Sequence, residues 1–200
     1  MVGYEYEKKA LEQGFKSICG IDEAGRGPLA GPVFAAAVIL PVGLEIEGLN
    51  DSKKLSEKKR ESLFDVIISN ASAYSVAYAD HAEIDEINIL NATFLAMTRA
   101  VNGLKIPADF ALVDGNRVPK GLSVPCETIV KGDGISASIA AASILAKVSR
   151  DRVMKKADEI YPEYMFAKHK GYPTALHREL VNKYGPCPIH RLTFLNKVLK

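Results

Sequence analysis

Two adjacent carboxylates, Asp22 and Glu23, stand directly after a short apolar run and directly before a glycine-rich loop. The stretch from Ser17 to Gly31 reads S-I-C-G-I-D-E-A-G-R-G-P-L-A-G. Hard cations such as Mg²⁺ prefer oxygen ligands, keep several waters and share their shell with substrate phosphate. A strand that carries two carboxylates to its C-terminal end therefore favours an enzyme that handles phosphate groups.

Two further aspartates also follow predicted strands. Asp114 ends the apolar run at residues 110–113, and Asp133 follows the run at 127–130 within the triplet K-G-D. In an open α/β sheet, sites form at the carboxyl edge of the strands, so residues distant in the sequence can converge there. We therefore expect a divalent-metal site formed by four carboxylates: Asp22, Glu23, Asp114 and Asp133.

Each carboxylate also has a purely structural interpretation. Asp114 with Gly115 is a common turn pair, and Asp133 could be the N-cap of a helix that begins near residue 135. The pair at residues 22–23 could be an exposed loop doublet. The metal-site interpretation is favoured because all of them stand at predicted strand ends.

The glycine loop at residues 25–30 formally matches the dinucleotide fingerprint G-x-G-x-x-A, which would indicate an NAD-binding protein. That fingerprint requires a helix to open at the loop, whereas Pro28, Pro32 and the apolar run at 33–40 predict another strand. The neighbouring carboxylates would also repel a pyrophosphate unless metals intervened. A dinucleotide enzyme is therefore the weaker alternative.

Composition predicts one globular domain with a full core, since the 200 residues are 48% hydrophobic and 25% charged. The three cysteines include no C-x-x-C pair, so neither a disulfide framework nor a zinc site is indicated, and a reducing cytoplasm fits. The N-terminus lacks the pattern of a signal peptide, and the longest apolar run is too short to cross a bilayer. We expect a soluble cytoplasmic protein without a membrane partner.

Charge is distributed unevenly along the chain, although the net charge is only +2. Residues 147–200 contain 12 Lys and Arg against 5 Asp and Glu, whereas residues 1–146 contain 14 against 19. The basic segment 147–200, called here the basic tail, would suit binding to a polyanion, while the acidic segment 1–146 would suit metal binding. A solvated helical surface is the alternative for the tail.

The pattern of apolar residues predicts alternating strands and helices. Ser56 is a predicted N-cap, and the small residues of the fourth helix predict close packing against a sheet. The expected strands are 17–22, 33–40, 73–79, 110–113 and 127–130. The expected helices are 4–13, 56–69, 83–103 and 135–156, followed by loops and short helices over 161–200.

Seven motifs, in this order, resemble bacterial ribonuclease HII, the type 2 ribonuclease H, from about residue 16 to residue 194. They are D-E-A-G-R-G-P-L-A-G-P-V from Asp22, L-N-D-S-K-K-L-S at 49–56, E-I-D-E-I-N-I-L at 83–90, V-D-G-N at 113–116, K-G-D at 131–133, S-I-A-A-A-S-I-L-A-K-V-S-R-D at 138–151 and H-K-G-Y-P-T at 169–174. One departure is G-Y-P-T, where many relatives have G-Y-G-T.

The resemblance implies a ribonuclease H-like mixed five-stranded sheet flanked by helices, with a catalytic core at 1–160 and a basic helical extension at 161–200 packed on it. It implies an endonuclease that cuts the RNA strand of RNA/DNA hybrids. It also implies incision on the 5′ side of single ribonucleotides in duplex DNA, as in ribonucleotide excision repair, leaving a 3′-hydroxyl and a 5′-phosphate. A monomer is expected.

By the same resemblance, the metal-site carboxylates fall on the four residues already selected by their strand-end positions. Two Mg²⁺ or Mn²⁺ ions are expected there, because one must activate the attacking water and the other must stabilise the leaving oxygen. Asp151 is interpreted instead as the ion-pair partner of a neighbouring Arg or Lys.

Substrate choice depends on the 2′-hydroxyl, which distinguishes RNA from DNA at a given position. The resemblance implies that the main chain of Gly25, Arg26 and Gly27 reads this hydroxyl, while Tyr172 packs on the sugar of the following deoxynucleotide. An ordinary core role is the alternative for Tyr172. Expected phosphate contacts, with solvated surface as the alternative for each, are Lys53, Lys54, His177, Arg178, His190 and Arg191. A module that binds hybrid without cutting it remains a further alternative.

Overall fold

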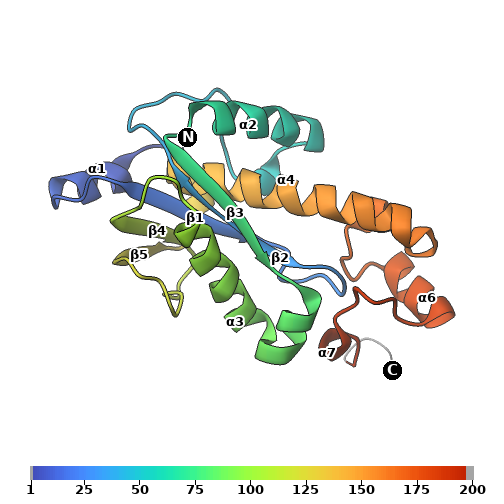
Figure 1. The fold of residues 1–200 in the computed structure, drawn as a ribbon. Helices are drawn as coiled ribbons and strands as arrows, with labels where there is room; N and C mark the ends of the chain where they lie inside the picture. Colours follow the sequence, from blue (N-terminus) through green and yellow to red (C-terminus); the bar gives the residue numbers. More distant parts are fainter. Residues whose placement is uncertain (1, 197–200) are drawn as a thin grey trace.

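The computed structural model describes residues 2–196 and contains a mixed five-stranded sheet (Figure 1). The strands are β1 (Ile18–Ala24), β2 (Val33–Ile39), β3 (Ala73–Ala79), β4 (Phe110–Asp114) and β5 (Cys126–Ile129). Their order across the sheet is β3-β2-β1-β4-β5, with the first three strands antiparallel and with β4 and β5 parallel to β1. The predicted fold class, a ribonuclease H-like sheet flanked by helices, is confirmed.

Helices lie on both faces of this sheet, and short helices follow near the C-terminal end of the chain (Figure 1). They are α1 (Glu5–Glu12), α2 (Glu57–Asn70), α3 (His81–Asn102), α4 (Ala137–Ile160), α5 (Phe166–His169), α6 (Ala175–Tyr184) and α7 (Leu192–Leu195). Alternate residues of β2 belong to different cores: Val33 and Ala35 pack with α3, whereas Phe34 and Ala36 pack with α2 and α4. This two-sided burial explains why the strand is apolar throughout.

Close packing of α4 on the sheet is confirmed. A Cβ atom on Gly20 of β1 would lie 2.1 Å from the carbonyl carbon of Ser138. The backbones therefore approach too closely for any side chain at this position, and the small residues of the first half of α4 permit that approach.

Helix starts follow the local capping chemistry. The hydroxyl of Ser56 accepts a hydrogen bond from the amide of Lys59 at 3.2 Å, which confirms Ser56 as the N-cap of α2. Ser136 caps α4, so the interpretation of Asp133 as that cap is wrong. Helix α3 begins two residues earlier than expected, because Asp80 forms a capping box with Glu83.

The chain after α4 packs its short helices around a separate apolar cluster. This cluster joins Phe166 and Val181 to Met154 of α4 and to Leu29 and Ala30, which follow the glycine loop. Residues 197–200 of the expected extension lie outside the described part of the chain. Within residues 2–196, no helix is both long enough and apolar enough to span a membrane.

Candidate active site

Strand register brings three of the four predicted carboxylates together. Because Ile21 of β1 pairs with Val113 of the parallel strand β4, the next residues, Asp22 and Asp114, lie side by side. Asp133 reaches them through a turn in which Lys131 adopts a left-handed conformation, with φ of 59°. One carboxylate oxygen from each aspartate then lies within 4.8 Å of the others.

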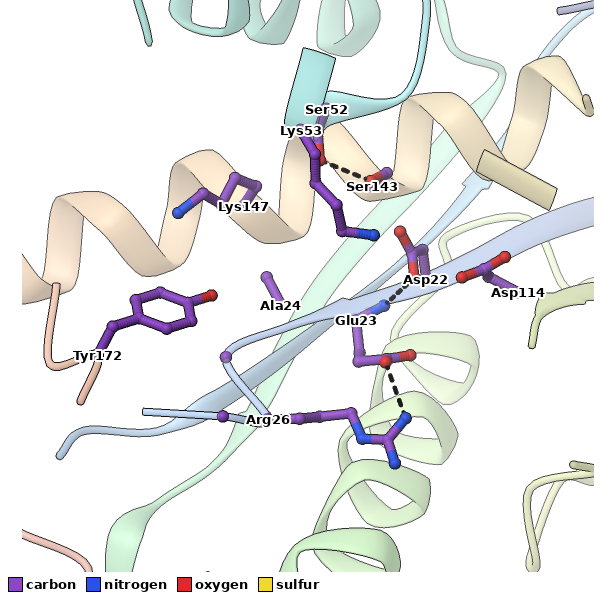
Figure 2. A pocket seen from close by; sticks show the side chains of 12 residues that line it. Asp22, Glu23, Ala24, Arg26, Ser52, Lys53, Asp114, Ser143, Lys147 and Tyr172 are labelled. Carbon is purple, nitrogen blue, oxygen red and sulfur yellow. Dashed lines mark hydrogen bonds and ion pairs between the residues drawn. The ribbon is translucent and has the colours of Figure 1, made fainter. Parts of the chain in front are cut away.

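Glu23 lies beside this cluster but on the other side of β1, since successive strand residues point to opposite faces (Figure 2). Its Oε1 is 3.3 Å from Nη1 of Arg26. Glu23 lines the same cavity as Asp22 and also a second hollow against α3. The four expected carboxylates thus comprise a cluster of three aspartates and one glutamate at its border.

The electrostatics of the cluster suit a cation. Burial, followed by the charges of Glu23 and Asp114, raises the pKa of Asp22 well above its usual range, although the Ser143 hydroxyl opposes this. Burial and then the charge of Asp133 raise the pKa of Asp114. Divalent cations would relieve this repulsion, and an all-oxygen donor set is the one they prefer. The residues therefore fit Mg²⁺ or Mn²⁺.

Lys53 extends from the short 3-10 helix at Ser52–Lys54 into the acidic end of the cavity (Figure 2). Its Nζ is 3.3 Å from Oδ2 of Asp133, while three quarters of the side chain remains exposed. Burial lowers the pKa of Lys53, but Asp133 and Asp22 outweigh this and raise it. Lys54 instead contacts Asp51 at 3.9 Å and lies outside the cavity lining in the described structure.

Tyr172 forms the other end of the cavity, away from Asp114 (Figure 2). Tyr172 is 37% exposed, so the core interpretation does not apply. The Arg150 guanidinium and the Lys147 ammonium lie 5.6 and 5.7 Å from the ring centroid. A Cβ built on Gly27 would lie 3.9 Å from the ring, so the glycine loop and Tyr172 form one continuous surface.

The cavity between these ends has a volume of about 220 Å³. Its lining consists of Asp22, Glu23, Ala24, Gly25, Arg26, Gly27, Ser52, Lys53, Asp114, Ser143, Lys147 and Tyr172. Sequence reasoning missed Ser143 and Lys147, which α4 presents one turn apart. The spacing of four residues from Ser143 through Lys147 to Asp151 is the signal that would have found them. Lys147 and Asp151 pair at 2.7 Å, which confirms the ion-pair interpretation of Asp151.

His177, His190 and Arg191 require a correction, because all three are almost completely buried and present no surface to a phosphate. Nδ1 of His177 donates to the carbonyl of Tyr172 at 3.0 Å, and Nε2 of His177 meets Nε2 of His190 at 3.0 Å. Arg191 donates to main-chain carbonyls. Arg178 is exposed, with Nε donating to the Pro173 carbonyl at 3.2 Å.

The dinucleotide alternative is wrong on the geometry of the glycine loop. The chain continues from this loop into β2, which pairs antiparallel with β1, so the helix that the fingerprint needs is replaced by a strand. The loop nevertheless lines the cavity through Gly25, Arg26 and Gly27.

The mixed sheet with an acidic cluster at the strand ends is the arrangement expected of a nuclease that uses divalent metal. A family model described as ribonuclease HII matches residues 19–197. Ribonuclease HII of Caldicellulosiruptor bescii is 58% identical over 196 residues, covering 98% of this chain and 95% of the relative. The chain belongs to the ribonuclease HII family and is a metal-dependent endoribonuclease.

Solved structures agree with this assignment. The crystal structure of ribonuclease H2 from Pyrococcus horikoshii OT3 superposes with a TM-score of 0.75 at 31% identity, covering 89% of this chain and 93% of that one. Bst-RNase HIII in complex with Mn²⁺ has a TM-score of 0.70 at 17% identity, covering 84% and 63% of the two chains, and shows the shared fold alone.

Proposed function

We propose that this protein hydrolyses the RNA strand of RNA/DNA hybrids and incises duplex DNA on the 5′ side of an embedded ribonucleotide. The observation that carries the proposal is the convergence of Asp22, Asp114 and Asp133 within 4.8 Å, at one end of a cavity whose other end is formed by the glycine loop and Tyr172. A metal site and a sugar-reading surface then face the same nucleotide.

The acidic end would hold two divalent ions, Mg²⁺ or Mn²⁺, with Asp22, Asp114 and Asp133 as ligands and Glu23 at the border. When bound, such ions activate the attacking water and stabilise the leaving 3′-oxygen, which yields a 3′-hydroxyl and a 5′-phosphate. The amide of Gly132 donates to Oδ1 of Asp114 at 2.7 Å and fixes the orientation of that carboxylate. Lys53 would contact a substrate phosphate beside this end.

The other end would select the nucleotide. Main-chain groups of Gly25, Arg26 and Gly27 would read the 2′-hydroxyl, and the exposed ring of Tyr172 would pack on the deoxyribose of the next nucleotide. Lys147 keeps positive charge beside that ring, where a sugar-phosphate backbone would pass. The Arg150 guanidinium is buried beneath the ring and adds positive potential there without contacting a phosphate. Recognition of one hydroxyl and one adjacent deoxyribose would define an RNA–DNA junction.

The direct test uses a DNA duplex that carries one ribonucleotide, incubated with the protein in Mg²⁺, in Mn²⁺ or in EDTA. We expect one incision on the 5′ side of the ribonucleotide, with a 3′-hydroxyl end, only where a divalent ion is present. An all-DNA duplex of the same sequence is the control and should stay intact. Tight binding without cleavage in either metal would instead identify a hybrid-binding module.

A further inference from the structure

Arg191, at the start of the last described helix, lies beneath the glycine loop rather than on the surface. Its side chain has no exposed area. The guanidinium donates to the carbonyl oxygens of Gly25 at 2.7 Å, Pro28 at 2.8 Å, Gly31 at 2.8 Å and Arg26 at 3.1 Å. Four neutral carbonyls therefore hold one buried cation, all of them within seven residues of chain.

These contacts fix how the loop presents its amides. In a trans peptide the carbonyl of one residue and the N–H of the next point in opposite directions. Because Arg191 draws the carbonyls of Gly25 and Arg26 toward itself, the N–H groups of Arg26 and Gly27 point away from it. Within residues 2–196, the structure records no intramolecular acceptor for either N–H. Both residues line the cavity.

The rest of the loop is held from the same direction. The amide of Arg191 donates to the carbonyl of Leu29 at 2.8 Å, and the amide of Gly31 donates to the carbonyl of Ile189 at 2.9 Å. Gly25 has φ of +99°, and a Cβ there would lie 2.1 Å from Nε of Arg150. The loop therefore has little freedom to rotate its peptide planes.

Asp85 on α3 secures the segment that carries Arg191. Its carboxylate accepts hydrogen bonds from the amides of Leu192 at 2.8 Å and Thr193 at 3.0 Å. Burial and then the nearby Arg150 lower the pKa of Arg191 to about 9, while Asp85 opposes this, so the guanidinium stays charged at neutral pH. Asp85 itself is half-exposed and outside the cavity lining in the described structure.

We propose that Arg191 is a positioning residue for ribonucleotide selection: it orients the peptide planes of Gly25–Gly27 so that the amides of Arg26 and Gly27 face the 2′-hydroxyl. This inference rests on the proposed reading of that hydroxyl by the loop. It assigns selectivity to a side chain that never touches substrate and that comes from the C-terminal segment.

The test measures selectivity in binding, with Ca²⁺ in place of Mg²⁺ to prevent cleavage. Dissociation constants are compared for a DNA duplex with one ribonucleotide and for the all-DNA duplex of the same sequence. Selectivity is the dissociation constant of the all-DNA duplex divided by that of the duplex with one ribonucleotide. Lysine keeps the charge but cannot reach four carbonyls, so Arg191→Lys should reduce this ratio by about fivefold or more, which corresponds to the loss of one neutral hydrogen bond. Affinity for the all-DNA duplex should stay within about twofold.

A second variant covers the case in which Arg191→Lys does not fold. Asp85→Ala removes a half-exposed carboxylate together with its hydrogen bonds to the amides of Leu192 and Thr193. It should therefore lower the same ratio, but by less than Arg191→Lys. Ile67→Ala, a buried truncation in α2 away from the cavity lining, is the control for reduced stability and should leave the ratio unchanged.

The outcomes separate the two levels of the proposal. A wild-type protein that binds both duplexes equally would refute hydroxyl reading by the loop, and this inference with it. A wild-type protein that selects the ribonucleotide, together with folded Arg191→Lys and Asp85→Ala proteins that select it equally well, would overturn the role of Arg191 alone. In steady-state kinetics with Mg²⁺, Arg191→Lys should raise KM for the duplex with one ribonucleotide and change kcat less.

Discussion

The two ends of the cavity are built on opposite electrostatic arrangements. At the acidic end, Asp22 and Asp114 are buried near like charges, and their pKa values are raised. At the tyrosine end, the cations of Arg150 and Arg191 are buried against neutral carbonyls that they satisfy with hydrogen bonds. Like charges repel one another at the acidic end until a divalent ion binds, whereas the buried cations of the tyrosine end already have their hydrogen-bond partners before any substrate arrives.

This difference separates chemistry from recognition. A site that must bind cations gains affinity from carboxylates that repel one another when the cations are absent. A site that must discriminate one hydroxyl gains from donors whose positions are already fixed, because less ordering is needed on binding. We therefore expect substitutions at the acidic end to remove activity without loss of stability, and substitutions at the tyrosine end to change selectivity.

The largest expected effect comes from Asp114→Asn, which tests the acidic end. The substitution keeps the shape of the side chain but removes a charge from the metal site, so kcat/KM should fall by about 100-fold or more, equivalent to about 2.7 kcal/mol. The melting temperature in EDTA should stay the same or rise slightly, because repulsion is relieved. Steady-state kinetics and thermal denaturation measure both.

Asp109→Asn is the matched control for that substitution. Asp109 directly precedes β4, the strand that ends at Asp114. Its carboxylate accepts hydrogen bonds from the amides of Lys16 at 2.8 Å and Ser17 at 2.9 Å. Its loss should lower the melting temperature but leave kcat/KM close to wild type. Near-normal activity of Asp114→Asn at saturating Mg²⁺ would remove Asp114 from the metal site.

The next effect tests the tyrosine end. If the ring of Tyr172 packs on a deoxyribose, Tyr172→Ala should cost roughly 1–3 kcal/mol in kcat/KM on a duplex with one ribonucleotide, with base stacking as a loose guide. A strand made entirely of RNA offers many alternative registers, so its cleavage should suffer less. Tyr172→Phe keeps the ring and should lose little. Equal losses on both substrates, with a lower melting temperature, would make Tyr172 a structural residue.

A smaller effect concerns the histidines beneath Tyr172. Burial lowers the pKa of both His177 and His190 from an ordinary 6.5 to about 4. Since their folded pKa values are depressed, the stability they contribute is present above about pH 6.5 and is lost as the pH falls toward 4. The raised pKa values of the acidic end act in the opposite sense, so a difference between variants is needed to isolate the histidine contribution.

His190→Gln supplies that difference. The unfolding free energy of wild type should fall as the pH is lowered from 6.5 to 4. In His190→Gln one titrating group is missing, so the slope of this fall should be smaller by up to about 1.4 kcal/mol per pH unit. Denaturant unfolding in EDTA at several pH values measures this slope. An identical slope in both proteins would mean that folding does not lower the pKa of His190.

The smallest effect is expected from the basic tail. If Lys168, Lys170 and Arg178 bind phosphates, their combined replacement by Ala should reduce the salt dependence of hybrid binding, by about 0.9 in the slope of log K against log salt for each phosphate no longer neutralised. The control replaces Lys16, Lys105 and Lys120, which are exposed and lie outside the cavity lining in the described structure. An equal slope change in both triple variants would indicate a non-specific loss of charge.

The acidic end was predictable from the sequence and the tyrosine end only in part. Asp22 and Asp114 stand where apolar strands end, and parallel register alone places them together. The positions of His177 and Arg191 depend on tertiary packing. The sequence around each of them shows only polar residues within a basic segment. Their burial could not be inferred because nearly all of their partners are main-chain carbonyl groups, which every residue type carries, so the sequence does not distinguish them.

The bond from Arg191 to the Gly25 carbonyl spans 166 residues of chain. On a ribosome, which adds about 5–20 residues per second, the strands and helices through α4 emerge well before the guanidinium that orders the loop. We therefore expect a nascent or truncated chain ending before residue 191 to form the sheet and bind divalent ions while lacking ribonucleotide selectivity. Synthesis from the N-terminus would thus assemble the metal site first and the ribonucleotide-selective loop last.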